Sequence, residues 1–88
     1  MLRISFLSNS DHAVEFQLEG KLVGPWVDEL RKLSDEALSQ EKSLSLNLEK
    51  LWFVDARGAA LLRELARRQV PQHNCSQFVR RQLKEAGQ

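Results

Sequence analysis

The sequence has few cysteines that could form disulfides and no long apolar segment that could anchor it in a membrane. Cys75 is its only cysteine, which excludes an internal disulfide and fits a reducing compartment. No stretch approaches the roughly 20 apolar residues of a membrane span. The first twelve residues also lack the uninterrupted apolar core of a secretion signal. We therefore expect a cytoplasmic protein without membrane insertion.

The chain also lacks an excess of charge of one sign. Its net charge is +1, although residues 1–50 carry six basic and nine acidic side chains, whereas residues 51–88 carry seven basic and three acidic ones. This asymmetry predicts a polarised surface. No aromatic residues alternate with the arginines of the basic half to stack on bases, so we predict no nucleic-acid partner.

Catalytic and metal-binding patterns are missing as well. The sequence offers no plausible Ser–His–Asp or Cys–His arrangement and no glycine-rich phosphate loop. His73, Asn74 and Cys75 are consecutive, and adjacent side chains seldom converge on one metal ion. A chain of 88 residues has little volume for a deep pocket. We predict neither an enzyme nor a protein with a metal or cofactor.

What the chain does contain is the composition of one globular domain over residues 1–88, with 42% hydrophobic and 28% charged residues. Apolar and polar residues alternate over residues 2–6 and again over residues 14–18, with turn residues between them. Alternation of this kind is typical of half-buried strands. The two runs therefore predict an antiparallel hairpin.

The remaining elements alternate between helix and strand. Gly24 and Pro25 precede an amphipathic helix, residues 44–54 read as a strand, and residues 59–68 as a second helix. A weak strand over residues 70–73 is placed at an edge by Pro71, and a last helix spans residues 76–86 and ends at Gly87. We predict an α/β fold in which the hairpin leads into right-handed β-α-β-α crossovers, with about four strands in a mixed sheet and three helices.

Several large side chains have default positions in the core. Trp52 lies in an apolar strand segment, which predicts burial. On the last helix, we expect an inward face formed by Cys75, Phe78, Val79 and Leu83. Trp26 follows a loop, so a place in the core and a place at the rim of a binding surface both remain open.

Two segments together resemble a known family. FQLEGKLVGPWVDELRKL, followed by LSLNLEKLWFVDARGAALL, is similar to the STAS domain, the fold of bacterial anti-sigma-factor antagonists and related modules. The order and spacing of the two segments carry the resemblance, which covers residues 1–70 well and the rest loosely. It implies a STAS-like β-α superhelix and a role in transcription regulation or signalling through protein–protein interaction.

One departure from that family bears on regulation. Regulatory members carry a phosphorylatable serine immediately after the aspartate of the strand-to-helix turn, and this chain has Ala56 there. The second serine of the pattern is Arg57, which places a cation in the first helical turn, against the macrodipole. The resemblance therefore implies a member that acts without phosphorylation at Ala56.

The strand-to-helix turn over Asp55, Ala56, Arg57 and Gly58 is the main candidate site. Asp55 reads as an N-cap, and Gly58 as a point of close packing. Arg57 is the best candidate for contact with an acidic partner group, against a solvated side chain or an ion pair as the alternative. If the two strands that precede the helices are parallel, their carboxyl ends share one edge of the sheet. The predicted partner-binding surface then also includes Lys21, Gly24 and Trp26.

Two functions from different classes remain open. The leading hypothesis is a non-enzymatic module that binds a protein partner, such as a kinase-like anti-sigma factor, a sensor or a transporter subunit. The alternative is a sensor of a small anionic ligand or nucleotide at the same helix N-terminus. Self-association is also open: the weak edge strand at Pro71 could pair with that of a second copy and form a homodimer.

Overall fold

The alternating residues at the start of the chain form an antiparallel hairpin, as predicted. Strand β1 (Leu2–Asn9) pairs with β2 (Ala13–Leu22), with Ile4 opposite Leu18 and Phe6 opposite Phe16. The structure is a computed structural model that describes residues 1–86. The register shifts between Phe6 and Ser8, so Leu7 forms a bulge on β1. This bulge bends β1 near the turn of the hairpin.

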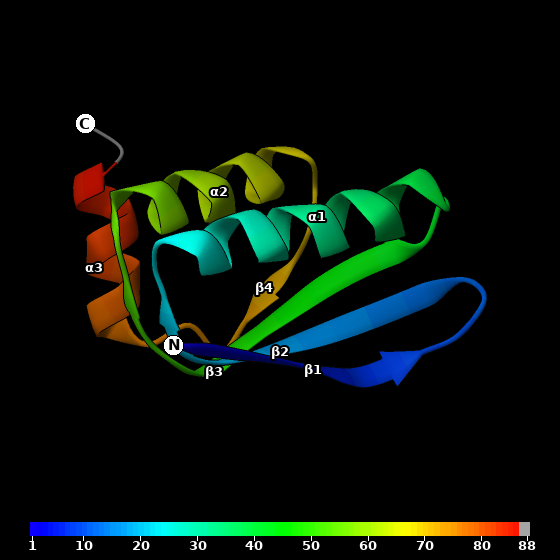
Figure 1. Cartoon of the computed structure of the whole chain (residues 1–88), viewed down its shortest axis with the longest axis horizontal. Coiled ribbons are helices and arrows are strands. Elements are labelled where there is room, and N and C mark those ends of the chain that lie inside the picture. Colours follow the sequence, from blue (N-terminus) through cyan, green and yellow to red (C-terminus); the bar gives the residue numbers. More distant parts are fainter. Residues whose placement is uncertain (87–88) are drawn as a thin grey trace.

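Helices and strands then alternate along the chain (Figure 1). Their bounds are α1 (Pro25–Ser39), β3 (Ser43–Val54), α2 (Ala56–Arg67), β4 (Gln72–His73) and α3 (Gln77–Ala86). Within the described residues the sheet has the order β1-β2-β3-β4, with β2, β3 and β4 mutually parallel. The predicted α/β class, mixed sheet and edge position of β4 are confirmed. Gly87, the expected end of α3, lies outside the described residues.

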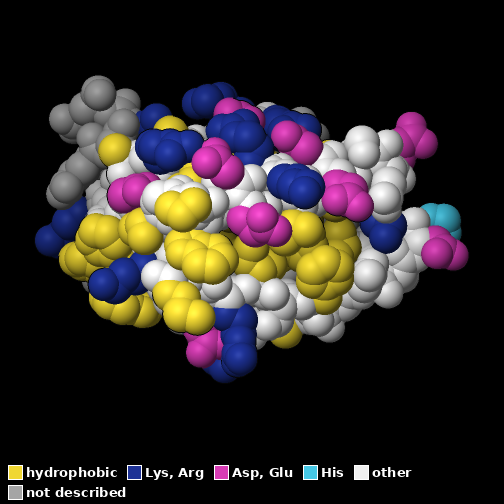
Figure 2. Space-filling model, in the orientation of Figure 1, with side chains coloured by type: hydrophobic (Ala, Val, Ile, Leu, Met, Phe, Trp, Pro, Cys, Tyr) yellow, Lys and Arg dark blue, Asp and Glu magenta, His cyan; other side chains and the backbone are white. Residues whose placement is uncertain are grey.

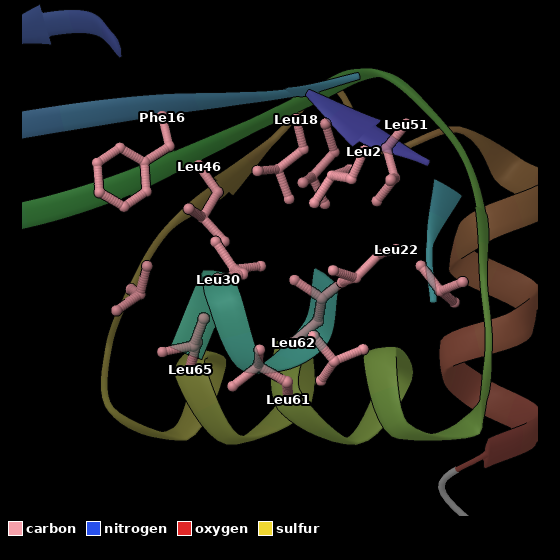
Figure 3. Close-up of a cluster of buried hydrophobic side chains, with 14 of the residues drawn as sticks. Leu2, Phe16, Leu18, Leu22, Leu30, Leu46, Leu51, Leu61, Leu62 and Leu65 are labelled. Atoms are coloured by element: carbon pink, nitrogen blue, oxygen red, sulfur yellow. The ribbon is translucent and has the colours of Figure 1, made fainter. Parts of the chain in front are cut away.

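The hydrophobic core lies between the sheet and the two helices α1 and α2. Figure 3 shows Phe16, Leu18 and Leu46 pointing from the strands toward Leu30 of α1 and Leu62 of α2. These side chains are almost completely buried, and each such burial stabilises a fold by about 1.5–3 kcal/mol. Among residues 1–86, no helix covers the opposite face of the sheet (Figure 1), which explains why the strands alternate in polarity.

Ion pairs join the adjacent flanks of α1 and α2. Arg31 contacts Glu64 at 2.8 Å, and Arg68 contacts Asp35 at 2.8 Å. The hydrogen bond to Glu64 raises the pKa of Arg31 above its ordinary value. Each partly exposed pair contributes at most about 1 kcal/mol. Their main consequence is that the acidic residues on this flank of α1 already have cationic partners.

Trp52 is not in the core, contrary to the sequence-based expectation. Its side chain is 57% exposed because β3 contains two more residues than β2 over the paired stretch. The register passes from Gln17 opposite Asn47 to Glu19 opposite Lys50, and then from Gly20 opposite Leu51 to Lys21 opposite Phe53. Trp52 is the second extra residue, so Leu51 and Val54 are buried while Trp52 turns outward.

Phe78 was also expected to point inward, and it is 58% exposed. Helix α3 packs through Val79, which is fully buried, with Cys75 and Leu83 packed against the core as predicted. These residues follow each other at intervals of four, and Phe78 lies about 100° away from that stripe. The interpretation of α3 as amphipathic is therefore right, but its apolar stripe is narrower than expected.

Candidate functional site

Asp55 is the structural centre of the strand-to-helix turn. Its Oδ1 accepts the backbone N–H of Gly58 at 2.7 Å, which makes Asp55 the N-cap of α2, as predicted. Its Oδ2 accepts the backbone N–H of Gly24 at 3.0 Å. Because the N-cap is Asp55, α2 begins at Ala56, three residues earlier than the expected start at Ala59. One carboxylate thus holds the β3–α2 turn and the β2–α1 loop together.

The β2–α1 loop adopts a backbone conformation that serves this contact. Gly24 has φ 55° and ψ −132°, a region that side-chain-bearing residues rarely adopt. The backbone N–H of Asp55 in turn donates to the carbonyl of Leu22 at 3.2 Å. The carboxyl ends of β2 and β3 are therefore adjacent, with Leu22 opposite Val54, and the expected shared edge of the sheet is present.

Gly58 is required by packing against the neighbouring strand. A Cβ atom at this position would lie 2.5 Å from the carbonyl oxygen of Leu22 and 3.0 Å from its side chain. Any side chain at position 58 would therefore push α2 away from β2. Gly58 supports the shape of the turn from within, since it is buried.

Ala56 and Arg57 form the exposed part of the turn. The Arg57 guanidinium donates to Asp28 of α1 at 2.9 Å, and both side chains are more than 60% exposed. This contact corresponds to the ion-pair alternative for Arg57. An exposed pair of this kind contributes little to stability, so the guanidinium remains accessible to another acidic group.

Lys21 and Trp26, which were expected to join the turn in one surface, have their described interactions elsewhere. The Lys21 ammonium lies 4.8 Å from the centre of the Trp52 ring, a cation–π contact on the face of the sheet that carries no helix. Within residues 1–86, Lys21 makes no hydrogen bond or ion pair with the turn. Trp26 is partly buried and packs against the hydrophobic core. Of the three expected companions, Gly24 is the one that forms a hydrogen bond with the turn within the described residues.

Gln82 of α3 belongs to the site, and the sequence analysis did not identify it. Its side-chain Oε1 accepts the backbone N–H of Val54 at 3.2 Å, and its Nε2 donates to the Val54 carbonyl at 3.1 Å. The amide thereby mimics one residue of a neighbouring strand at the exposed edge of β3. No local sequence pattern predicts this contact, because it depends on how α3 packs against the end of β3.

Cys75 and the possible metal-ligating side chains are the other groups that could carry chemistry. Burial raises the pKa of the Cys75 thiol, although nearby Arg80 acts in the opposite direction. Within residues 1–86, no three His, Cys, Asp or Glu side chains are arranged to hold a metal ion. No helix in this range is long and apolar enough to cross a membrane.

Comparison with solved structures identifies the architecture. A structure titled as the anti-sigma factor antagonist SpoIIAA in its unphosphorylated form superimposes with a TM-score of 0.68 and 23% sequence identity, covering 93% of this chain and 82% of that one. The chain has the STAS fold. The fold implied by the sequence resemblance is thus confirmed. No protein-family model and no curated protein matches the sequence.

Proposed function

We propose that this STAS-fold protein is a non-enzymatic module of anti-sigma-factor-antagonist type, which binds a protein partner through the turn at Asp55–Gly58. The observation that carries the proposal is the double acceptance by Asp55, which joins this turn to Gly24. Ala56 and Arg57 are thereby presented from a rigid base at the carboxyl ends of β2 and β3. A preorganised surface loses little conformational entropy when a partner binds.

The partner chemistry follows from the exposed groups of the turn. Arg57 offers a planar cationic fork whose present partner, Asp28, is itself largely exposed. Exchange of Asp28 for a carboxylate on another protein costs little, because an exposed pair contributes at most about 1 kcal/mol. We infer that an acidic group of the partner contacts Arg57, with Ala56 allowing close approach.

The same turn supports action without phosphorylation. Ala56 and Arg57 have no hydroxyl group, so a switch of about −1.5 to −2 charges at these positions is unavailable. The relation to the partner is therefore governed by concentration or by changes in the partner. The partner classes that fit this role are an anti-sigma factor with a kinase fold, a sensor and a transporter subunit.

The alternative, a sensor of a small anion or nucleotide, receives less support from the geometry. The Asp55 carboxylate occupies the start of α2 and already accepts the N–H of Gly58. An anion at the same helix N-terminus would meet this negative charge at close range and would compete for the same donor. We therefore favour the protein partner over the anionic ligand.

A capture experiment tests the proposal with a charge swap. The tagged chain is incubated with native lysate of the source organism, and the bound proteins are quantified by mass spectrometry. We expect the unmodified chain to capture a specific protein. The variant Arg57→Glu should no longer capture it, and neither should the double variant Asp28→Arg with Arg57→Asp. The swap preserves the ion pair while it removes the cation from the turn, so it separates partner contact from local stability.

The matched control is Arg67→Glu, an exposed arginine at the other end of the same helix. It reverses the same charge without changing the turn, and captured protein should remain. Equal capture by all variants, or equal loss by Arg57→Glu and Arg67→Glu, would refute recognition through the turn.

A further inference from the structure

An apolar groove runs beside the free edge of the sheet, at the opposite end from the Asp55 turn. It has a volume of about 220 Å³ and lies between β1–β2 and α1, lined on the two sides by Phe6, Phe16 and Leu33. Phe6 is 52% exposed although it packs against Phe16 with a ring separation of 5.0 Å. Figure 2 shows hydrophobic side chains in this region, with both acidic and basic side chains above them along α1.

The backbone of β1 presents free hydrogen-bonding groups along the edge of the sheet, from Leu2 to Phe6 beside the groove. The carbonyl of Met1 accepts the N–H of Lys21 at 2.9 Å, so the odd-numbered residues of β1 bond toward β2. Since an antiparallel ladder alternates, Leu2, Ile4 and Phe6 direct their N–H and C=O groups away from β2. β1 is the edge strand, and this side of it has no strand partner within residues 1–86.

The flank of α1 beside the groove carries two glutamates, with the exposed Lys32 between them in sequence. Leu33 and Glu36 line the groove, and Glu29 lies one helical turn before Leu33 on the same flank. In the part of the chain that the structure describes, neither Glu29 nor Glu36 forms an ion pair. On the other flank, Asp28 is paired with Arg57 of α2, and Asp35 with Arg68, the residue after α2. Lys42, at the far end of the groove, donates to Asn9 at 3.1 Å.

We propose that this groove is a second interaction surface, which binds an extended, basic segment of a partner protein as an added strand on β1. Apolar side chains of the segment occupy the space beside Phe6 and Leu33, and its lysine or arginine residues on the same face meet Glu29 and Glu36. The backbone groups of Leu2, Ile4 and Phe6 supply the hydrogen bonds. Strand addition of this kind takes affinity from the main chain and specificity from alternate side chains.

A second copy of the chain fits the groove less well. Pairing of two β1 strands about a twofold axis would bring the α1 flanks of both copies together on one face of the joined sheet. The glutamates Glu29 and Glu36 of one copy would then face those of the other, which is unfavourable. The bulge at Leu7 further shortens the stretch of β1 that is able to pair.

The test uses a labelled peptide with the sequence Lys-Thr-Val-Thr-Val-Thr-Lys, in which lysines and valines share one face of a strand. Fluorescence anisotropy with the complete protein should show binding at least about fivefold tighter than for the same peptide with glutamates in place of the lysines, since two exposed ion pairs are exchanged for two repulsions. On binding, hydrogen exchange at the amides of Ile4 and Phe6 should slow. Equal affinity for both peptides, or no binding of either, overturns the proposal.

Protein variants separate the charge and backbone contributions. Glu29→Lys with Glu36→Lys should reverse the preference between the peptides. Glu19→Lys with Glu49→Lys, which changes the net charge equally on exposed strand positions facing away from the helices, should leave it intact. If the segment runs antiparallel to β1, methylation of the valine amides of the peptide should abolish binding. If it runs parallel to β1, methylation of the threonine amides should abolish binding. Binding that survives both methylations excludes strand addition.

Two further measurements separate this groove from the Asp55 turn and a partner peptide from a second copy of the chain. Arg57→Glu should leave peptide affinity unchanged, so that failure at this groove and failure at the Asp55 turn are distinguishable. Sedimentation equilibrium of the unmodified chain should show a monomer. A dimer that Ile4→Pro dissociates would identify a second copy as the occupant and overturn the proposal, because this proline removes an outward-pointing N–H group from β1.

Discussion

The side-chain carboxylate of Asp55 accepts the backbone N–H of Gly24, 31 residues earlier in the chain, at 3.0 Å. The same carboxylate accepts the N–H of Gly58 at 2.7 Å. A capping residue usually serves only its own helix. Here it also fixes the entry into α1, so the two helices begin from a common point at the edge of the sheet.

Removal of this carboxylate should destabilise the protein. In Asp55→Ala, two partly buried N–H groups lose their acceptor, and we expect the free energy of unfolding to fall by about 1–3 kcal/mol. Urea denaturation measures the change. The stability of Asp55→Asn should lie between that of the unmodified protein and that of Asp55→Ala. The asparagine amide keeps one oxygen as an acceptor but presents its NH₂ group, a donor, to the other backbone N–H. Asp11→Ala, in the exposed turn of the hairpin, is the control.

Gly58→Ala should also destabilise the fold, although alanine is the better helix former. The helix propensity favours alanine by about 1 kcal/mol, whereas overpacking costs about 1–3 kcal/mol. The Cβ would lie 2.5 Å from a backbone oxygen of Leu22, which cannot move without shifting β2. We therefore expect a net loss of about 1 kcal/mol in urea denaturation.

Ala60→Gly gives the propensity contribution alone, since Ala60 is an exposed position in the same helix. This control should cost about 1 kcal/mol. A Gly58→Ala protein that is as stable as the unmodified chain would show that α2 can move away from β2 without loss.

The order of the elements and most of the core were predictable because they depend on local periodicity. Alternation placed Phe16 and Leu18 on the inner face of β2, and helical spacing placed Leu30 and Leu62 opposite them. Asp55 was predictable as an N-cap for the same reason: the residues that it caps follow it directly.

The remaining features depend on contacts between distant segments. Trp52 is exposed because β3 has two extra residues relative to β2, and a single strand does not reveal the register of its partner. The contact between Asp55 and Gly24 arises only once β2 and β3 are paired in parallel. Arg57 was predicted to be available to a partner, but its pairing with Asp28 required the relative position of α1 and α2.

Gln82 should hold the end of β3 in place. In Gln82→Ala, the backbone N–H and C=O of Val54 lose both partners, which we expect to lower the free energy of unfolding by about 1–2 kcal/mol. Hydrogen exchange at the Val54 amide should become faster. Gln82→Glu should recover little, because a carboxylate accepts the N–H but cannot donate to the carbonyl.

The neighbouring substitution Arg81→Ala is the control, since Arg81 is exposed on α3 and should change stability by no more than about 0.5 kcal/mol. If Gln82→Ala left the Val54 amide as protected as before, β3 would not depend on α3 at this point.

Ser34 of α1 is an opportunity for stabilisation. Its side chain is fully buried, and its Oγ has no hydrogen-bond partner within the described residues. A buried hydroxyl without a partner is unfavourable, and alanine also has the higher helix propensity. Ser34→Ala should therefore raise the free energy of unfolding by about 0.5–1 kcal/mol in thermal or urea denaturation. Ser39→Ala, at an exposed position where Oγ donates to the backbone carbonyl of Glu36 at 2.8 Å, should bring no such gain. A loss of stability in Ser34→Ala would mean that the hydroxyl is hydrogen-bonded in solution, most simply to a carbonyl of the preceding helical turn.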